Sequence, residues 1–291
     1  MITNLKIGNL GRLGNQFFQY AILKSIAIKN RYDIVLPSNE NNLFHGQEFL
    51  LKKFNLDCKF QPSISIDNIL NEDEPNVFYP EFQDAKENTS VQGYFQNLNY
   101  FDHIKSILKK EFEPQKNYLN QADEYFNFIK KKYPNKKIAS FHIRRGDFFK
   151  FRFTDITNGN VGLSLYGSPF WLSKKSIFYK YFQKVIKEID IENTVFIVFS
   201  GGSRNSDKKN LKWLEKCFKG LNFEISKSID PVLDFTLMLK ADINVLSFAS
   251  SFGWWAAYLN ENNQKYAPKS YFFGIEGGNI DYLFNDEFKL L

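Results

Sequence analysis

The sequence predicts an α/β fold made of two consecutive domains, and three features of the chain carry this prediction. Near the amino terminus a short apolar strand, a glycine-rich loop and a helix are followed by a second strand, which is the order of a βαβ unit. A second alternation of strands and helices begins at Lys137. Pro134 and the lysines around it separate the two series. We therefore expect one domain over residues 1–134 and another over residues 135–291.

In the first series, alternation over residues 2–7 predicts a strand, and three glycines spaced three residues apart predict a tight loop after it. Asn15 is expected to cap the following helix, because its side chain can accept a hydrogen bond from the first helical amides. The three glycines are Gly8, Gly11 and Gly14. Further elements are expected as strands at residues 33–36 and 90–95 and as helices at residues 104–112 and 118–133.

The second series opens with an apolar strand at residues 138–143. Apolar residues on one face predict a helix that ends near Ile189 and is capped by Ser173. Residues 195–199 are all apolar, which is typical of a strand buried on both faces of a parallel sheet. The remaining elements are expected as helices at residues 206–218, 231–240 and 250–259 and as a strand at residues 243–246.

The balance of charges favours an acidic partner. The formal net charge is +6 and the isoelectric point is about 9, which suits sugar nucleotides, nucleic acid or an anionic membrane face. The longest basic run, Lys130–Lys132, is followed by Lys136 and Lys137 and is either a solvated linker or a contact with a membrane surface. The chain has no single basic helix and no RNA-binding signature, so a nucleic-acid-binding protein is the least favoured class.

Cysteine and histidine usage argue against disulfides and zinc. Cys58 and Cys217 lie far apart, so a reducing compartment is the better expectation. The histidines show no pair at helical spacing. No run approaches the ~18 apolar residues of a membrane span, and no secretory signal is evident. We expect a cytoplasmic protein, with peripheral association at the inner membrane face as the alternative.

The strand at residues 138–143 delivers two arginines and a carboxylate to the loop at its carboxyl end. Ligands of open α/β sheets bind at this edge, and the planar donor fork of arginine suits phosphate oxygens. The residues are Arg144, Arg145 and Asp147, with Gly146 allowing the loop to turn closely beside a ligand. A solvated strand end with an incidental Arg–Asp pair is the structural alternative.

A second group of polar residues lies near the end of the chain. Ser250 and Ser251 lie where a strand becomes a helix, so their hydroxyls and amides suit a phosphate, although two capping serines explain the sequence equally well. Asp234, on the helix before that strand, suits the two N–H donors of a guanine edge. Trp254 and Trp255 are best explained by core packing.

Two further observations concern phosphate binding. The glycine-rich loop offers amides at a helix N-terminus to an anion, but its spacing is neither the dinucleotide fingerprint nor a Walker loop, and a structural turn is the ordinary explanation. No Asp-x-Asp pair, which holds a divalent metal on the diphosphate in many sugar-nucleotide transferases, occurs in the chain. If the chain handles a nucleotide sugar, Arg144 and Arg145 must neutralise the leaving diphosphate, and no metal is expected.

Taken together, three segments resemble the fucosyltransferase superfamily, which includes bacterial α-1,2-fucosyltransferases, protein O-fucosyltransferases and core α-1,6-fucosyltransferases. The family's G-G-L-G-N-Q-x-F-Q-Y-A segment is seen here over residues 11–21. Its H-x-R-R-G-D segment is seen over residues 142–147, and its S-S-F-S-W-W-A-A-type segment over residues 250–257. The three segments occur in the family's order and span most of the chain.

The resemblance implies a GT-B-like α/β fold of two facing Rossmann-like domains, with the acceptor groove mainly in residues 1–134 and GDP in residues 135–291. It implies an inverting, metal-independent transfer of L-fucose from GDP-fucose to an oligosaccharide or glycolipid hydroxyl, in α-1,2 linkage on galactose. The expected pathway is synthesis of a surface polysaccharide such as lipopolysaccharide O-antigen, with no cofactor. The alternatives are transfer of another GDP-linked deoxy sugar, and a non-catalytic relative that binds a nucleotide sugar.

The resemblance also implies roles for single residues. Arg144 matches the arginine that holds the β-phosphate, and Arg145 matches its supporting neighbour. Asp147 is the candidate general base, and orientation of the two arginines is the alternative that we favour. The remaining expected substrate-binding residues are Gly14, Asn15 and Gln16 in the first domain and His142, Asp234, Ser250, Ser251 and Phe252 in the second.

The chain departs from the family pattern at four places. Arg12 replaces the usual second glycine, as in the protein O-fucosyltransferase branch. Ala249 stands where asparagine precedes the serine pair, and Gly253 stands where a serine precedes the tryptophans. Residues 200–202, Ser-Gly-Gly, replace Ser-Asp-Asp. These changes leave the diphosphate argument intact and bear on the specificity for sugar and linkage.

Overall fold

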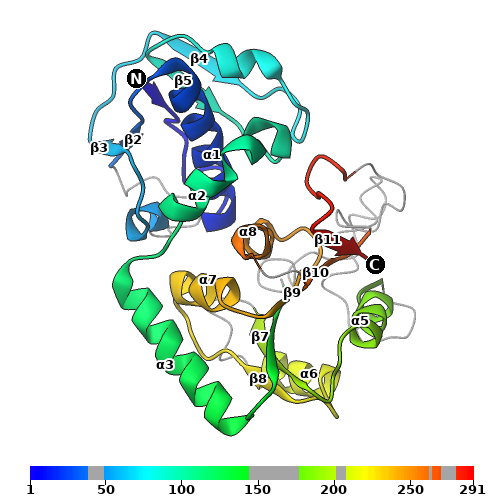
Figure 1. Cartoon of the computed structure of the whole chain (residues 1–291). Coiled ribbons are helices and arrows are strands. Elements are labelled where there is room, and N and C mark those ends of the chain that lie inside the picture. The colour runs from blue at the N-terminus through cyan, green and yellow to red at the C-terminus, as the bar shows by residue number, and fades with distance from the viewer. Residues whose placement is uncertain (39–48, 144–176, 201–207, 262–263, 270–279) are drawn as a thin grey trace. The chain divides into compact units, whose positions relative to one another are not determined.

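The computed structural model describes residues 1–38, 49–143, 177–200, 208–261, 264–269 and 280–291, and the chain divides into two compact units (Figure 1). Unit 1 comprises Met1–Gln115 with Asp281–Phe284, and unit 2 comprises Lys116–Ile280 with Asn285–Leu291. The division therefore falls before helix α3 (Lys116–Lys132), not at residues 134/135. Helix α3 joins unit 2 because its buried face packs against α7 (Pro231–Leu239).

Unit 1 contains short parallel strands among the described residues. β1 pairs with β5 and β5 with β4, while β2 pairs with β3, and a parallel bridge between Ile2 and Ile34 links the two groups. The strands are β1 (Ile2–Thr3), β2 (Val35–Pro37), β3 (Lys59–Gln61), β4 (Asn68–Asn71) and β5 (Thr89–Gln92). β3 and β4 lie in a stretch that the sequence indicates only as loops, because they are short and mostly exposed and carry no apolar alternation.

Helix α1 (Leu13–Asn30) is the central helix of unit 1 and is buried on nearly every side up to Ala27. Two of its buried polar side chains, Lys24 and Tyr20, are paired with Glu111. Lys24 Nζ lies 2.6 Å from Glu111 Oε1, and the Tyr20 hydroxyl donates to Glu111 Oε2 at 2.5 Å. Burial and the Glu111 carboxylate raise the pKa of Tyr20. These bonds attach α2 (Lys105–Glu111) to α1, and the pairing matters because an unpaired buried charge is strongly destabilising.

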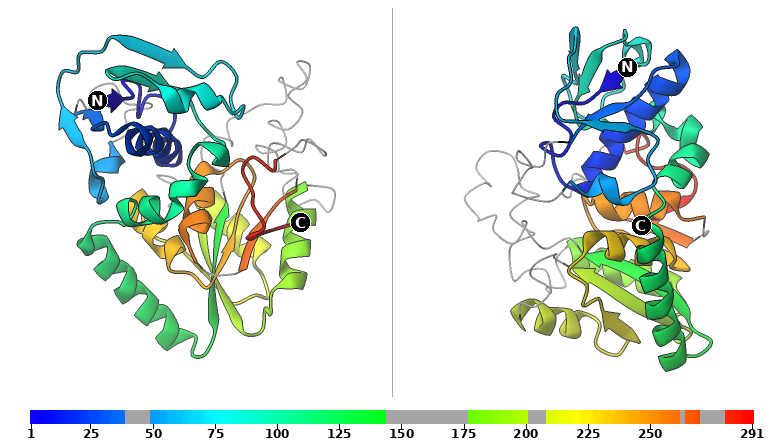
Figure 2. Two further views of the ribbon diagram at one scale, coloured as in Figure 1. Left: turned by 45° about the horizontal axis from the view of Figure 1, so that its top comes forward. Right: turned by 90° about the vertical axis from the view of Figure 1, so that its left-hand side faces the viewer.

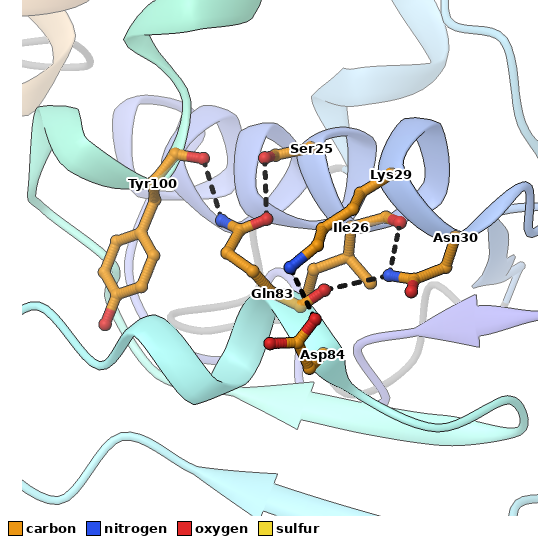
Figure 3. A network of polar contacts seen from close by, with 7 residues as sticks. All are labelled: Ser25, Ile26, Lys29, Asn30, Gln83, Asp84 and Tyr100. Carbon is orange, nitrogen blue, oxygen red and sulfur yellow. Dashed lines mark hydrogen bonds and ion pairs between the residues drawn. The ribbon is translucent and has the colours of Figure 1, made fainter.

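The carboxyl-terminal half of α1 also holds the 3₁₀ turn Pro80–Asp84 in place (Figure 3). The Ser25 hydroxyl donates to Gln83 Oε1 at 2.9 Å, and Asn30 Nδ2 donates to the Gln83 carbonyl at 2.9 Å. Gln83 Nε2 in turn donates to the Tyr100 carbonyl at 3.1 Å. One glutamine thus joins the turn, the helix and the segment around Tyr100.

Unit 2 is built on a parallel sheet with the strand order β11-β10-β9-β6-β7-β8 in the part of the chain that the structure describes. Every residue of β7 is buried, which confirms the expectation of a strand buried on both faces of the sheet. The strands are β6 (Lys137–Ile143), β7 (Thr194–Ser200), β8 (Phe223–Ile225), β9 (Ile243–Val245), β10 (Gln264–Ala267) and β11 (Phe288–Leu290). Besides α3 and α7, the helices are α5 (Ile177–Glu188), α6 (Lys208–Cys217) and α8 (Ser251–Leu259). Ser173, the expected cap of α5, lies outside the described residues.

Alternation along β6 directs its side chains to two different layers. Phe141 and Ile143 enter the core formed with α5 and α6. Ser140 and His142 point to the opposite face, because successive side chains of a strand alternate. That face carries α7 and α8, as Figures 1 and 2 show, and there Ser140 bonds Asn244 of β9. The pleat of one strand therefore places His142 on the side of α8.

One sequence-based assignment in α1 is wrong. The helix begins at Leu13, with Arg12 in the cap position and without a side-chain capping bond. Asn15 lies in the first turn and does not cap the helix. Its backbone N–H donates to the Arg12 carbonyl at 2.9 Å. The loop thus closes through its backbone, and the Asn15 side chain has a different partner.

The buried amide of Asn244 generates a prediction for the stability of unit 2. Asn244 Nδ2 donates to Ser140 Oγ and to the Met238 carbonyl, each at 2.8 Å, and Oδ1 accepts from Asn260 at 2.7 Å. Asn244→Leu keeps the branched shape of the side chain but leaves these groups without that partner, so the free energy of unfolding should fall by about 2–4 kcal/mol. Urea denaturation measures this.

The matched control is Lys240→Ala, which removes an ion pair with Asp123 that is open to solvent. It should change the free energy of unfolding by less than about 1 kcal/mol. Equal, small effects of the two substitutions would contradict a structural role of the Asn244 network.

Candidate functional site

The carboxyl edge of the unit 2 sheet holds the described part of the candidate site. β6 ends at Ile143, immediately before the arginine pair in the sequence. Arg144, Arg145 and Asp147 lie outside the described residues, so their expected roles stay predictions. The structure describes the other motif residues of this edge, and it brings three of them together: His142, Ser250 and Phe252.

Ser250 links β6 to helix α8. It occupies the N-cap of α8, where its hydroxyl oxygen accepts the Gly253 amide at 3.2 Å. The same oxygen lies 2.8 Å from His142 Nδ1. One hydroxyl can make both bonds because it has two lone pairs and one proton. Ser250 therefore caps the helix and also fixes the imidazole, and its contact with a phosphate stays a prediction.

Aromatic rings form one wall beside this hydrogen bond. The Phe252 ring lies edge-to-face with His142 at 5.4 Å between centroids, and it lies 5.8 Å from Phe235 of α7. Ser251 and Phe252 are half-buried. The first turn of α8 holds no acidic residue, so its amides and the helix dipole favour an anion at this end. This geometry suits the phosphate-binding interpretation of Ser250 and Ser251.

Ala249, just before the cap, has a backbone conformation that bears on one departure from the family pattern. Its φ of 46° lies in the left-handed region. Asparagine adopts this region several-fold more readily than most residues, which gives a physical reason for the asparagine of the resembled family. Alanine at this position stores backbone strain next to the N-terminus of α8.

Asp234 of α7 is buried, and its carboxyl group is hydrogen-bonded. Ser226, which follows β8, donates through its hydroxyl to Asp234 Oδ1 at 2.8 Å. Burial raises the pKa of the carboxyl group from 3.8 to about 7, although the serine hydroxyls act in the opposite direction. The carboxyl group therefore titrates near neutrality. Among the described contacts, the ring pair of Phe235 and Phe252 links this part of α7 to the start of α8.

Unit 1 presents the remaining motif residues. Gly11 has φ of 95°, and a β carbon there would lie 1.9 Å from Asn15 Nδ2, so only glycine fits beside Asn15. Asn15 Oδ1 accepts from Gln96 Nε2 at 3.0 Å, while Gly14 and Gln16 are buried in α1. The interaction with Gln96 was not predicted, since no motif marks that residue; its only signal is its position just beyond a strand.

The described residues offer no group of three or more His, Cys, Asp or Glu side chains that could hold a metal ion. Within the same residues, no helix has both the length and the apolar character needed to cross a membrane.

Comparisons with known proteins agree with the resemblance seen in the motifs. No family model matches the chain. The O-antigen biosynthesis glycosyltransferase WbnK of Escherichia coli is 25% identical over 309 aligned residues, covering 91% of this chain and 93% of that protein.

Among solved structures, POFUT1 in complex with GDP matches with a TM-score of 0.55 at 12% identity and covers 94% of this chain and 98% of its own. POFUT1 in complex with GDP-fucose matches with a TM-score of 0.53 at 13% identity, covering 94% and 97% of the two chains. The chain thus has the α/β fold of a fucosyltransferase of known structure, which confirms the resemblance at the level of the fold.

The raised pKa of Asp234 generates a prediction for the pH dependence of stability. Between pH 4 and about 7 the folded protein binds a proton at Asp234 that the unfolded chain has lost. Stability therefore falls as pH rises through this window, by up to about 1.4 kcal/mol per pH unit for this one group. Urea denaturation of the unliganded protein from pH 4.5 to 8 measures the slope.

Asp234→Asn removes the titrating group and keeps an acceptor for the Ser226 hydroxyl. The difference in unfolding free energy between the wild type and Asp234→Asn should therefore shift in favour of the variant as pH rises to about 7. A difference that does not vary with pH would contradict the raised pKa.

Proposed function

We propose that the chain is an inverting glycosyltransferase that transfers L-fucose from GDP-fucose to a hydroxyl group of a glycan acceptor. The observation that carries this proposal is the presence of three ordered motifs on a chain with the fold of POFUT1, which has been solved with GDP-fucose. The GT-B-like arrangement implied by the resemblance is part of the proposal. The likeness to WbnK supports an acceptor in O-antigen or a similar surface polysaccharide. Galactose as the acceptor sugar and the α-1,2 linkage are proposed on the resemblance of the motifs alone.

On the donor side, Arg144 and Arg145 are proposed to neutralise the leaving diphosphate, in place of a metal. The acceptor hydroxyl attacks C1 of the fucose while the bond from C1 to the β-phosphate oxygen breaks and GDP departs with the electron pair. Negative charge builds on the β-phosphate as the sugar becomes oxocarbenium-like, so donors fixed at that phosphate lower the barrier. The start of α8, which Ser250 fixes, supplies amides and a favourable dipole for the same anion.

Two carboxyl groups have separate proposed roles. Asp234 accepts the two N–H donors of the guanine edge in its ionised form, which its pKa of about 7 leaves half-populated at neutral pH before a ligand binds. Asp147 either takes the proton of the acceptor hydroxyl or orients the arginines, and we favour the second role.

The acceptor-side residues are proposed to lie in unit 1. Asn15 of the same unit, whose side chain accepts a hydrogen bond from Gln96, is proposed to reach the sugar-diphosphate.

A second candidate function is transfer of another GDP-linked deoxy sugar. It is favoured by the departures at Ala249, Gly253 and residues 200–202, which change the candidate site without removing the arginine pair. The third alternative is a non-catalytic relative, which would bind GDP-fucose without transfer or hydrolysis. A competition assay with several GDP-sugars and a panel of galactosides distinguishes the three.

We propose that the protein acts in the cytoplasm and contacts the inner membrane face peripherally. Lys130, Lys131 and Lys132 at the end of α3 are exposed, although Lys132 also pairs with Glu224. Lysines near an anionic lipid surface each add favourable electrostatic energy.

Arg144→Ala tests the proposed chemistry most sharply. Loss of one fixed donor to the developing charge should lower the turnover of GDP-fucose at least ~100-fold. Arg31→Ala is the matched control, since Arg31 is exposed beyond the end of α1; its turnover should stay near that of the wild type. Thermal unfolding verifies that both variants fold, and near-normal turnover in folded Arg144→Ala would rule out the assigned role.

A further inference from the structure

Gly253 packs directly against the imidazole of His142. A β carbon at position 253 would lie 3.0 Å from His142 Nδ1, 3.4 Å from His142 Cβ and 3.4 Å from Ser250 Oγ. The 3.0 Å contact is tighter than almost all contacts of real β carbons, so a side chain at position 253 requires the imidazole to shift by a few tenths of an ångström. The resembled family carries a serine at this position, and the chain thus differs from it at the point where His142 is held.

The His142 ring has little freedom to move away. Its Nδ1 bonds the Ser250 hydroxyl at 2.8 Å, and its ring also contacts the Phe252 ring, which lies against Phe235. The backbone of β6 is paired with β7 on one side and β9 on the other. A methyl group at position 253 therefore shifts the imidazole by a few tenths of an ångström against its bond to Ser250 and its contact with Phe252.

The helix propensity of glycine does not explain its presence at position 253. Gly253 is buried within a helix whose next residues are apolar, and glycine is less favourable than alanine inside a helix. Glycine therefore does not stabilise the helix, but it leaves room for the imidazole of His142 beside the helix N-terminus.

We infer that Gly253 is a positioning residue, whose missing side chain lets His142 bond Ser250 at the carboxyl edge of the sheet. The consequence for nucleotide binding rests on the proposed function, because it assumes that GDP binds beside His142. The effect on the His142 ring and on stability does not depend on that assumption.

The test compares four proteins: the wild type, Gly253→Ala, His142→Ala and the double variant. The chain has three histidines, His45, His103 and His142, so the NMR signal of the His142 ring is identified by its absence in His142→Ala. Each protein is titrated with GDP, its melting temperature is measured, and the ring signals are followed as pH changes.

Gly253→Ala should shift the His142 ring signal and its titration and should weaken GDP binding by about 5-fold, since residues in contact show coupled effects. In the His142→Ala background the same substitution should change GDP affinity by less than about 2-fold and raise the melting temperature, because only the preference of the helix for alanine remains. If Gly253→Ala does not fold while the double variant does, the conflict with the imidazole is demonstrated by stability alone.

An unchanged His142 signal in folded Gly253→Ala would overturn the inference. Equal effects of Gly253→Ala with and without His142, including failure to fold in both backgrounds, would also overturn it, because α8 itself would then be the sensitive element. If the wild type binds no GDP, the proposed function fails, while the ring signals and melting temperatures still decide the positioning role.

Discussion

A single hydroxyl joins the two elements that form the described part of the candidate site. Ser250 Oγ accepts the Gly253 amide and bonds His142 Nδ1, so it fixes the start of α8 relative to the end of β6. The bond is possible because alternation along β6 points His142 to the face that carries α8. If this contact were lost, the imidazole of His142 would no longer be hydrogen-bonded to the cap of α8.

Buried hydrogen bonds in neighbouring elements hold the strands and helices around the Ser250–His142 contact in place. Asn244 connects β9 to β6 and α7 through buried hydrogen bonds, and Asn260 closes the other end of α8 onto the same amide. Asp234 lies on α7 with its carboxyl group held by Ser226, which follows β8. The strands β6 and β8 therefore each lead to a hydrogen-bonded polar residue, His142 and Ser226, at the carboxyl edge of the sheet. This is the edge where open α/β sheets bind ligands.

In unit 2 the strands β6, β7 and β9 could be predicted because they are apolar runs, and the helices because they have clear faces. The short strands β8, β10 and β11 were not predicted. Ser250 as a cap and the buried strand β7 are confirmed. The strands β3 and β4 were missed because they are short and exposed, and the division of the chain was misplaced because α3 belongs to its packing partner α7 and not to its neighbours in sequence. Contacts between distant segments, such as Gln96 with Asn15 and Ser226 with Asp234, leave no local pattern, so only the structure reveals them.

The central claim is that the carboxyl edge of unit 2 binds GDP without a metal. The most direct measurement is a saturation titration of the purified protein with GDP, GDP-fucose and UDP-sugars, each in the presence and absence of EDTA. The account predicts tight binding that is selective for GDP and its fucose derivative and is unaffected by EDTA. Preference for UDP, or binding that requires a divalent metal, would contradict it and would remove the roles given to Asp234 and Arg144.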